Sequence, residues 1–185
     1  GSSEVGGLVG LLEYIGIVNG TATGAVVNTG TSGSAGGLVG SQQAYYASSS
    51  IVDSRASGNV SGGQFAGGLV GSRSGFGGVA AGSTGIRDSS ASGDVSGARM
   101  AGGLVGSYDG SHGSSDTHID AGIRRSTASG RVSGTQYVGG LVGQFSGYGG
   151  FDGGVAAGGI SDSLATGAVT LAYGNATSNA AVGGL

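Results

Sequence analysis

The two histidines of the chain lie in one polar stretch and could ligate a metal. His112 and His118 have Asp116 and Asp120 interleaved with them or close by. Imidazole nitrogens and carboxylate oxygens are the ligands of zinc and related metals. The spacing matches no established ligand frame, however, and a polar surface insert explains the same residues. We therefore predict no metal site and keep these four residues as the candidates for one.

Aspartates beside glycines raise the question of calcium. The calcium-binding nonapeptide repeat requires Gly-Gly-x-Gly-x-Asp, and this pattern does not occur in the chain. Asp53 and Asp88 occupy equivalent positions of a repeat and could share a cation. Arg87, Arg124 and Arg125 nearby offer a simpler neutralisation. We expect no cofactor, with calcium as the alternative.

Catalysis finds no support in the residue pattern. Serines are abundant, so pairing any of them with the two histidines would be chance. Glycan-cleaving enzymes use clustered carboxylates, whereas the ten acidic residues here are scattered and only Glu4 and Glu13 are glutamates. The glycine-rich stretches are not phosphate-binding loops, because those need a following Lys and the chain has none. We predict that the chain is not an enzyme and has no catalytic residues.

The composition points to glycine with a structural role. The chain has 47 Gly among 185 residues and no Pro or Cys, against a usual glycine share of about 7%. Collagen needs Gly at every third position and Pro, and a flexible linker would not be 37% hydrophobic. A net charge of −3 gives no electrostatic footprint for nucleic acid. No apolar run is long enough for membrane insertion.

Two sequence signatures alternate along the chain. Gly-Gly-Leu-Val-Gly starts at Gly6, Gly36, Gly67, Gly102 and Gly139, and a partial copy starts at Gly183. A second signature, Ile-x-x-[Ser/Gly]-x-Ala-[Ser/Thr]-Gly-x-Val, covers residues 17–26, 51–60, 86–95, 123–132 and 160–169. Repeat units of roughly 20–50 residues, such as these, bury an apolar face only by stacking on neighbouring units. We predict one all-β domain over residues 1–185, a parallel β-solenoid of about five to six coils with Gly-rich inserted loops.

The second signature also predicts which residues face inward. Side chains alternate across a strand, so Ser54, Ala56, Gly58 and Val60 should face the interior and the residues between them should face water. The isoleucine has the opposite parity, so a corner should precede the serine, at Asn19, Asp53, Asp88 and Asp162. The adjacent Leu and Val of Gly-Gly-Leu-Val-Gly cannot both point inward along a flat strand. Either one of these columns faces outward and needs a cover, or the chain bends between them.

Aromatic residues gather in the inserts, and Asn-x-Ser/Thr sequons are scattered. The contact candidates are Phe76, Tyr108, Tyr148 and Phe151. They suit stacking on sugar rings, but they suit covering an outward Leu or Val stripe equally well, and we favour the covering role. The candidates for N-glycosylation are Asn19, Asn59 and Asn175. The outward column Thr21, Arg55, Ser90, Thr127, Leu164 is not the flat threonine ladder of an ice-binding face.

The paired signatures resemble the GLUG-motif repeat family, named for its Gly-Leu-hydrophobic-Gly core. The family's Ser-x-Ala-[Ser/Thr]-Gly-x-Val segment matches residues 54–60, 89–95 and 126–132. The resemblance implies a stalk or adhesin-like part of a large bacterial or archaeal surface protein. Such repeats also accompany the catalytic domain of bacterial immunoglobulin A1 peptidases. The His-Glu-x-x-His motif of metallopeptidases is absent here, so proteolysis is not implied.

We therefore expect a non-catalytic structural or adhesive module that is extracellular or at the cell surface. Its expected partners are copies of itself, bound end to end or laterally, or other surface proteins. End-to-end stacking would build a filament, because an uncapped solenoid exposes an unpaired strand edge. The alternative is a β-solenoid that binds or processes carbohydrate.

Overall fold

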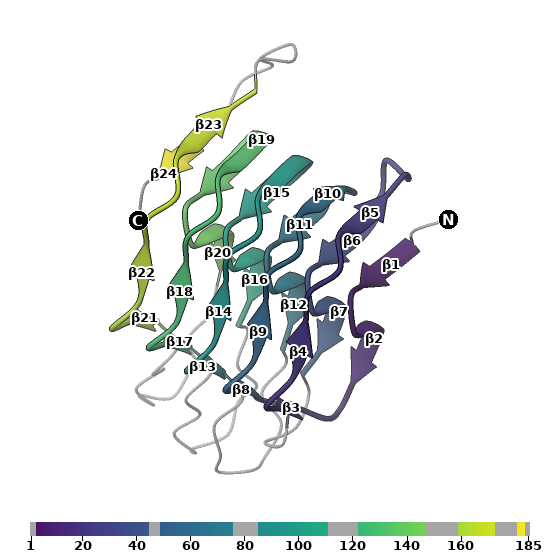
Figure 1. The fold of residues 1–185 in the computed structure, drawn as a ribbon, viewed down its shortest axis with the longest axis vertical. Coiled ribbons are helices and arrows are strands. Elements are labelled where there is room, and N and C mark those ends of the chain that lie inside the picture. Colours follow the sequence, from purple (N-terminus) through teal and green to yellow (C-terminus); the bar gives the residue numbers. More distant parts are fainter. Residues whose placement is uncertain are drawn as a thin grey trace, which may run out of the picture.

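The computed structural model describes residues 3–44, 49–75, 85–110, 122–146, 159–172 and 181–183. Every strand in these ranges pairs in parallel with its neighbours, and the described residues contain no helix. None of them therefore forms a helix that could cross a bilayer. The fold is an all-β parallel β-solenoid, as the repeat predicts (Figure 1).

Four parallel sheets run along the solenoid axis, and three of them have five strands each. The first contains β2 (Val9–Glu13), β7 (Val39–Gln43), β12 (Val70–Ser74), β16 (Val105–Asp109) and β20 (Val142–Ser146). The second contains β3 (Ile17–Val18), β8 (Ile51–Val52), β13 (Ile86–Arg87), β17 (Ile123–Arg124) and β21 (Ile160–Ser161). The third contains β4 (Thr21–Ala22), β9 (Arg55–Ala56), β14 (Ser90–Ala91), β18 (Thr127–Ala128) and β22 (Leu164–Ala165).

The fourth sheet has nine strands. Along its main path lie β1 (Ser3–Gly6), β6 (Gly33–Gly36), β11 (Phe65–Gly67), β15 (Val95–Gly102), β10 (Val60–Gly62) and β5 (Val26–Asn28). Beside β15 lies β19 (Val132–Gly139), which pairs in turn with β23 (Val169–Leu171) and β24 (Ala181–Gly183). We call the strands that one repeat contributes to the stack a rung.

Equivalent residues of successive repeats lie directly beside one another. Ala56 pairs with Ala91 and Ala91 with Ala128, and the isoleucine and valine columns pair in the same way. Figure 1 shows the resulting ladder, from the purple first rung to the yellow last one. The predicted stacking is confirmed, and the hydrophobic interior is built from these columns.

The predicted alternation of inward and outward residues is also confirmed. Ala56 and Val60 are buried, whereas Arg55 and Asn59 between them are exposed. The corner before each serine is a residue with positive φ, which reverses the parity after the isoleucine. The corner residues are Asn19 (φ 58°), Asp53 (51°), Asp88 (53°), Arg125 (45°) and Asp162 (50°). Asn and Asp tolerate this left-handed conformation better than other side chains.

In Gly-Gly-Leu-Val-Gly, either the Leu or the Val column had to face outward, or the chain had to bend. The structure shows a bend. Strand β11 ends at Gly67 and β12 begins at Val70, and both Leu69 and Val70 are fully buried. At Gly67 the chain folds back so tightly that a Cβ would lie 1.9 Å from the carbonyl oxygen of Val70. Only glycine fits there. Both columns therefore face the interior, and no outward apolar stripe has to be covered along the middle rungs.

Candidate interaction surfaces

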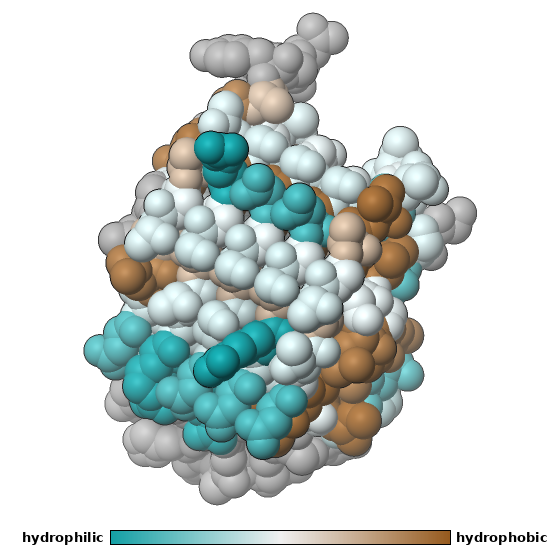
Figure 2. All heavy atoms as spheres, viewed as in Figure 1, coloured by the Kyte–Doolittle hydropathy of each residue, from teal (hydrophilic) through white to brown (hydrophobic). Residues whose placement is uncertain are grey.

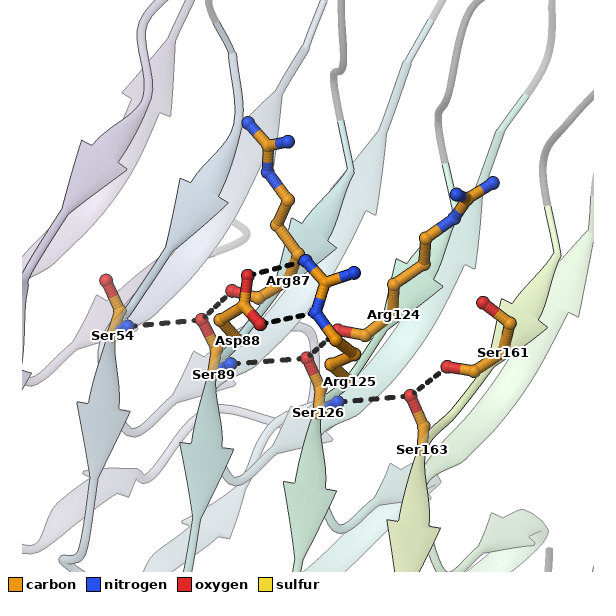
Figure 3. A network of polar contacts seen from close by, with 9 residues as sticks. All are labelled: Ser54, Arg87, Asp88, Ser89, Arg124, Arg125, Ser126, Ser161 and Ser163. Atoms are coloured by element: carbon orange, nitrogen blue, oxygen red, sulfur yellow. Dashed lines mark hydrogen bonds and ion pairs between the residues drawn. The ribbon is translucent and has the colours of Figure 1, made fainter.

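A ladder of serine hydroxyls crosses the solenoid at the corner that follows each isoleucine (Figure 3). Its members are the buried Ser54, Ser89 and Ser126 and the partly exposed Ser163. Each hydroxyl accepts a hydrogen bond from a backbone N–H of the preceding rung, as Ser89 Oγ does from Ser54 N at 3.2 Å. Each also donates to the carbonyl two residues before it, at 2.8 Å. The ladder satisfies the polar backbone of the corner inside an apolar core.

An ion pair joins two neighbouring corners outside this ladder. Arg125 occupies the corner position that is Asp88 in the previous rung, and its guanidinium donates to both carboxylate oxygens of Asp88, at 2.7 and 2.8 Å (Figure 3). The hydrogen bond from Arg125 lowers the pKa of the Asp88 carboxyl below its ordinary value. Desolvation opposes this, and the charges of Arg125 and Arg87 add to it. An Asp at position 125, as at the neighbouring corners Asp88 and Asp162, could not make this ion pair.

The four candidate metal ligands are not tested by the structure. His112, His118, Asp116 and Asp120 lie outside the described residues. Within the described ranges, no group of three or more His, Cys, Asp or Glu residues could hold a metal. Asp53 and Asp88 were the alternative site for calcium. The Asp88 carboxylate is hydrogen-bonded to the Arg125 guanidinium, one of the nearby arginines that the sequence suggested as a neutralising partner.

Among the contact candidates, the structure places Tyr108 in the interior. Its side chain is 1% exposed and stacks on Phe145 with ring centroids 4.9 Å apart. The prediction of a surface contact at Tyr108 is therefore wrong, because β16 continues to Asp109 and carries this tyrosine on its inward face. Phe76, Tyr148 and Phe151 lie outside the described residues.

The column that contains Tyr108 also buries an arginine that sequence reasoning missed. Arg73 pairs in register with Tyr108 on one side and Gln42 on the other. Its guanidinium lies 5.4 Å from the centre of the Tyr108 ring and donates to Gln42 Oε1 and, at 3.1 Å, to the carbonyl of Ser49. Arginine is almost never fully buried unless paired. The available signal was its position two residues after Gly71, on the same parity as the buried Leu69 and Gly71.

A column of three larger side chains runs along the nine-stranded sheet. Phe65 pairs with Met100, and Met100 pairs with Tyr137. Phe65 and Tyr137 are partly exposed and Met100 between them is buried. The two aromatic side chains lie two rungs apart, about 9.6 Å at the spacing of parallel strands.

Two of the three candidate glycosylation sites are described. Asn19 is an exposed corner residue with positive φ. Asn59 is exposed, and its side-chain oxygen accepts a hydrogen bond from Asp94 N at 2.9 Å. Asn175 lies outside the described residues.

Exposed apolar side chains gather on the first rung. Leu11, Val18 and Val27 are outward residues with exposed side chains, and Val18 reaches 66%. In the next rung, the positions of Leu11 and Val27 are Ser41 and Ser61. Figure 2 shows apolar surface along the right-hand edge, where the first rung lies in Figure 1, whereas the face over the middle rungs is mostly pale or hydrophilic. We call Leu11, Val18 and Val27 the first-rung flank.

Comparison with known proteins identifies the repeat. The GLUG motif matches residues 31–61, which run from β6 through β10 and so span one turn around the solenoid. No curated protein and no solved structure matches the chain. The matched turn pairs in register with equivalent residues of the rungs on both of its sides. Residues 31–61 therefore carry a GLUG motif, as the resemblance predicts.

Proposed function

We propose that the chain is a non-catalytic structural module of an extracellular or cell-surface protein and that it works by associating with copies of itself. We count one coil for each Gly-Gly-Leu-Val-Gly unit, which gives five coils and the start of a sixth at Gly183. The stack is a scaffold whose interior is filled by its own columns. Its contacts are then made by the edges and the flanks. The surface location rests on the resemblance to adhesin-like GLUG-repeat proteins.

The first-rung flank carries this proposal. Leu11, Val18 and Val27 are exposed apolar side chains at outward positions, and the positions of Leu11 and Val27 are serines in the next rung. Exposed apolar patches rimmed by polar residues mark association sites.

Sedimentation velocity over a range of concentrations tests self-association, with electron microscopy for longer assemblies. The wild-type chain is expected to form oligomers as its concentration rises. Leu11→Glu places a charge in the first-rung flank and is expected to weaken association at least tenfold. The matched control is Ser41→Glu, in the same outward column one rung on, which should leave association unchanged. Monodisperse monomers without fibres at every concentration would refute the proposal.

Carbohydrate binding is the second candidate, and the Phe65–Met100–Tyr137 column is the observation that favours it. Aromatic faces stack on sugar rings, and this column runs along the stack as a polysaccharide chain would. Co-sedimentation with insoluble polysaccharides tests it. Binding that is lost in Phe65→Ala/Tyr137→Ala, and kept in the Leu11→Glu variant, would support this candidate. A glycan array without hits would end it.

A further inference from the structure

A buried arginine lies among apolar side chains inside the stack. Arg73 is 2% exposed, and its register partners are Gln42 on one side and Tyr108 on the other. Beyond these two residues the column continues to Leu12 and Phe145, which are both apolar. A guanidinium cannot be deprotonated in a protein, and a buried charge is stable only when it is paired. Arg73 therefore requires a negative charge beside it.

The described residues surround this guanidinium with neutral groups. It donates to Gln42 Oε1 and, at 3.1 Å, to the carbonyl of Ser49, and it lies 5.4 Å from the centre of the Tyr108 ring. An aromatic face attracts a cation, but it does not carry the opposite charge. None of the described carboxylates forms an ion pair with Arg73. Both hydrogen bonds to described residues leave from Nη1, so the N–H groups of Nε and Nη2 remain for a further acceptor.

A second donor lies in the same cluster. Ser49 is fully buried, and its carbonyl accepts from Gln42 Nε2 at 3.0 Å as well as from Arg73 Nη1. These contacts bring the hydroxyl of the same residue close to the guanidinium. Ser49 Oγ has no hydrogen-bond partner among the described residues, and a buried polar group without a partner is costly. The hydroxyl and the guanidinium can satisfy each other's need by donating to one shared anion.

The side chain of Gln42 holds this arrangement in place. Gln42 is fully buried, and its Nε2 donates to the carbonyls of Ser49 and, at 3.3 Å, Ile15. Because Nε2 is turned toward these two carbonyls, Oε1 faces Arg73 and accepts from its guanidinium. The cation is thus positioned by the fold itself, and a preorganised site loses less entropy when a ligand binds.

We propose that Arg73 and Ser49 bind a small monovalent anion, a halide such as chloride, inside the stack. The guanidinium carries a single positive charge, so a single negative charge balances it. The burial of Gln42, Ser49 and Arg73 restricts the ligand to a small ion. The site is separate from the first-rung flank and from the Phe65–Met100–Tyr137 column, so it does not depend on self-association or on glycan binding.

Urea unfolding in sodium chloride and in sodium fluoride at equal ionic strength tests the site. An anion that binds only the folded chain stabilises it, so the wild-type midpoint should rise with chloride concentration. Fluoride is more strongly hydrated and should give no such rise. Arg73→Met keeps a long unbranched side chain in the column and should abolish the chloride dependence. Arg99→Met, which removes an exposed arginine instead, should retain it, and Ser49→Ala should raise the apparent Kd for chloride severalfold.

Crystals of the wild-type chain grown in sodium bromide give a second measurement, which does not depend on the folding of any variant. An anomalous peak in contact with the Arg73 guanidinium and Ser49 Oγ is expected. An ordered water at that place, or bromide only at other places, would overturn the proposal. A chloride dependence that is the same in Arg73→Met and Arg99→Met would also overturn it, because the stabilisation would then come from a general salt effect.

Discussion

Replacing Ser89 with alanine isolates the contribution of one hydroxyl in the buried ladder. Ser89 is 2% exposed, and its Oγ is the acceptor for the N–H of Ser54, which is itself fully buried. The carbonyl of Arg87, to which Ser89 Oγ donates, keeps a second partner because it also accepts from Asp53 N at 3.2 Å. The variant therefore leaves essentially one buried donor without a partner.

An unsatisfied buried donor costs about 1–3 kcal/mol. Taking about 2 kcal/mol and a urea dependence of about 2 kcal/mol per M, the unfolding midpoint should fall by about 1 M. The control is Ser92→Ala, three residues further on, at an outward and exposed position. Exposed substitutions of this kind stay within about 0.5 kcal/mol, so the control midpoint should move by no more than about 0.25 M.

Far-UV circular dichroism is the suitable probe of urea unfolding, since the chain has no Trp. Amide hydrogen exchange adds a local measurement, in which residue 54 should exchange faster in Ser89→Ala than in the wild type. Equal midpoints for Ser89→Ala and Ser92→Ala would refute the reasoning. So would unchanged exchange at residue 54, because the N–H would then depend on another acceptor.

Three further outcomes follow from the corners and the ion pair. Gly67→Ala should lose more than about 3 kcal/mol of stability or fail to fold, because its Cβ meets a backbone oxygen. Gly24→Ala, where a Cβ meets nothing within 4 Å, should melt like the wild type. Arg125→Asn keeps a side chain suited to positive φ but removes the donor to Asp88, so an NMR titration should show the pKa of Asp88 rising toward its ordinary value; an unmoved pKa would contradict the assignment. Because the folded-state pKa of Asp88 is lowered, its contribution to stability is present above the unfolded pKa of about 3.9 and is lost as pH falls through the folded pKa. The wild type should therefore lose more stability than Arg125→Asn on acidification below about pH 4, and equal losses in urea midpoints would contradict this.

Residue alternation was enough to predict most of the interior. The repeat fixed which residues share a column, and parity then separated Ala56 and Val60 from Arg55 and Asn59, as the structure confirms. The corner at Asp53 was predictable for the same reason, because the isoleucine before it has the wrong parity. The alternation of residues along a strand therefore predicts which side chains face the interior wherever the chain runs straight or turns through one residue.

Sequence reasoning did not predict the side-chain orientation where the chain bends sharply or where a repeat position holds an unusual residue type. The Leu69–Val70 bend could not be predicted from parity, since it depends on how closely Gly67 approaches the carbonyl of Val70. Tyr108 was assigned to an insert because the insert was taken to begin after Gly106, the last glycine of Gly-Gly-Leu-Val-Gly, whereas β16 continues to Asp109. Arg73 was not expected in the core, because burial of its charge depends on Gln42, which is distant in sequence and adjacent only in the fold.

The serine ladder gives the stack a direction. In each rung from Gly20 to Ser126, a backbone N–H donates to the serine hydroxyl of the following rung. None of these amides donates to a serine hydroxyl of the preceding rung. Removing the last rung would take away the hydroxyl that accepts from Ser126 N. Removing the first rung would take away the amide that donates to the Ser54 hydroxyl and also the Gly20 carbonyl that accepts from Arg55 N. The ladder is therefore polar, with a backbone N–H donor at one end and a hydroxyl acceptor at the other.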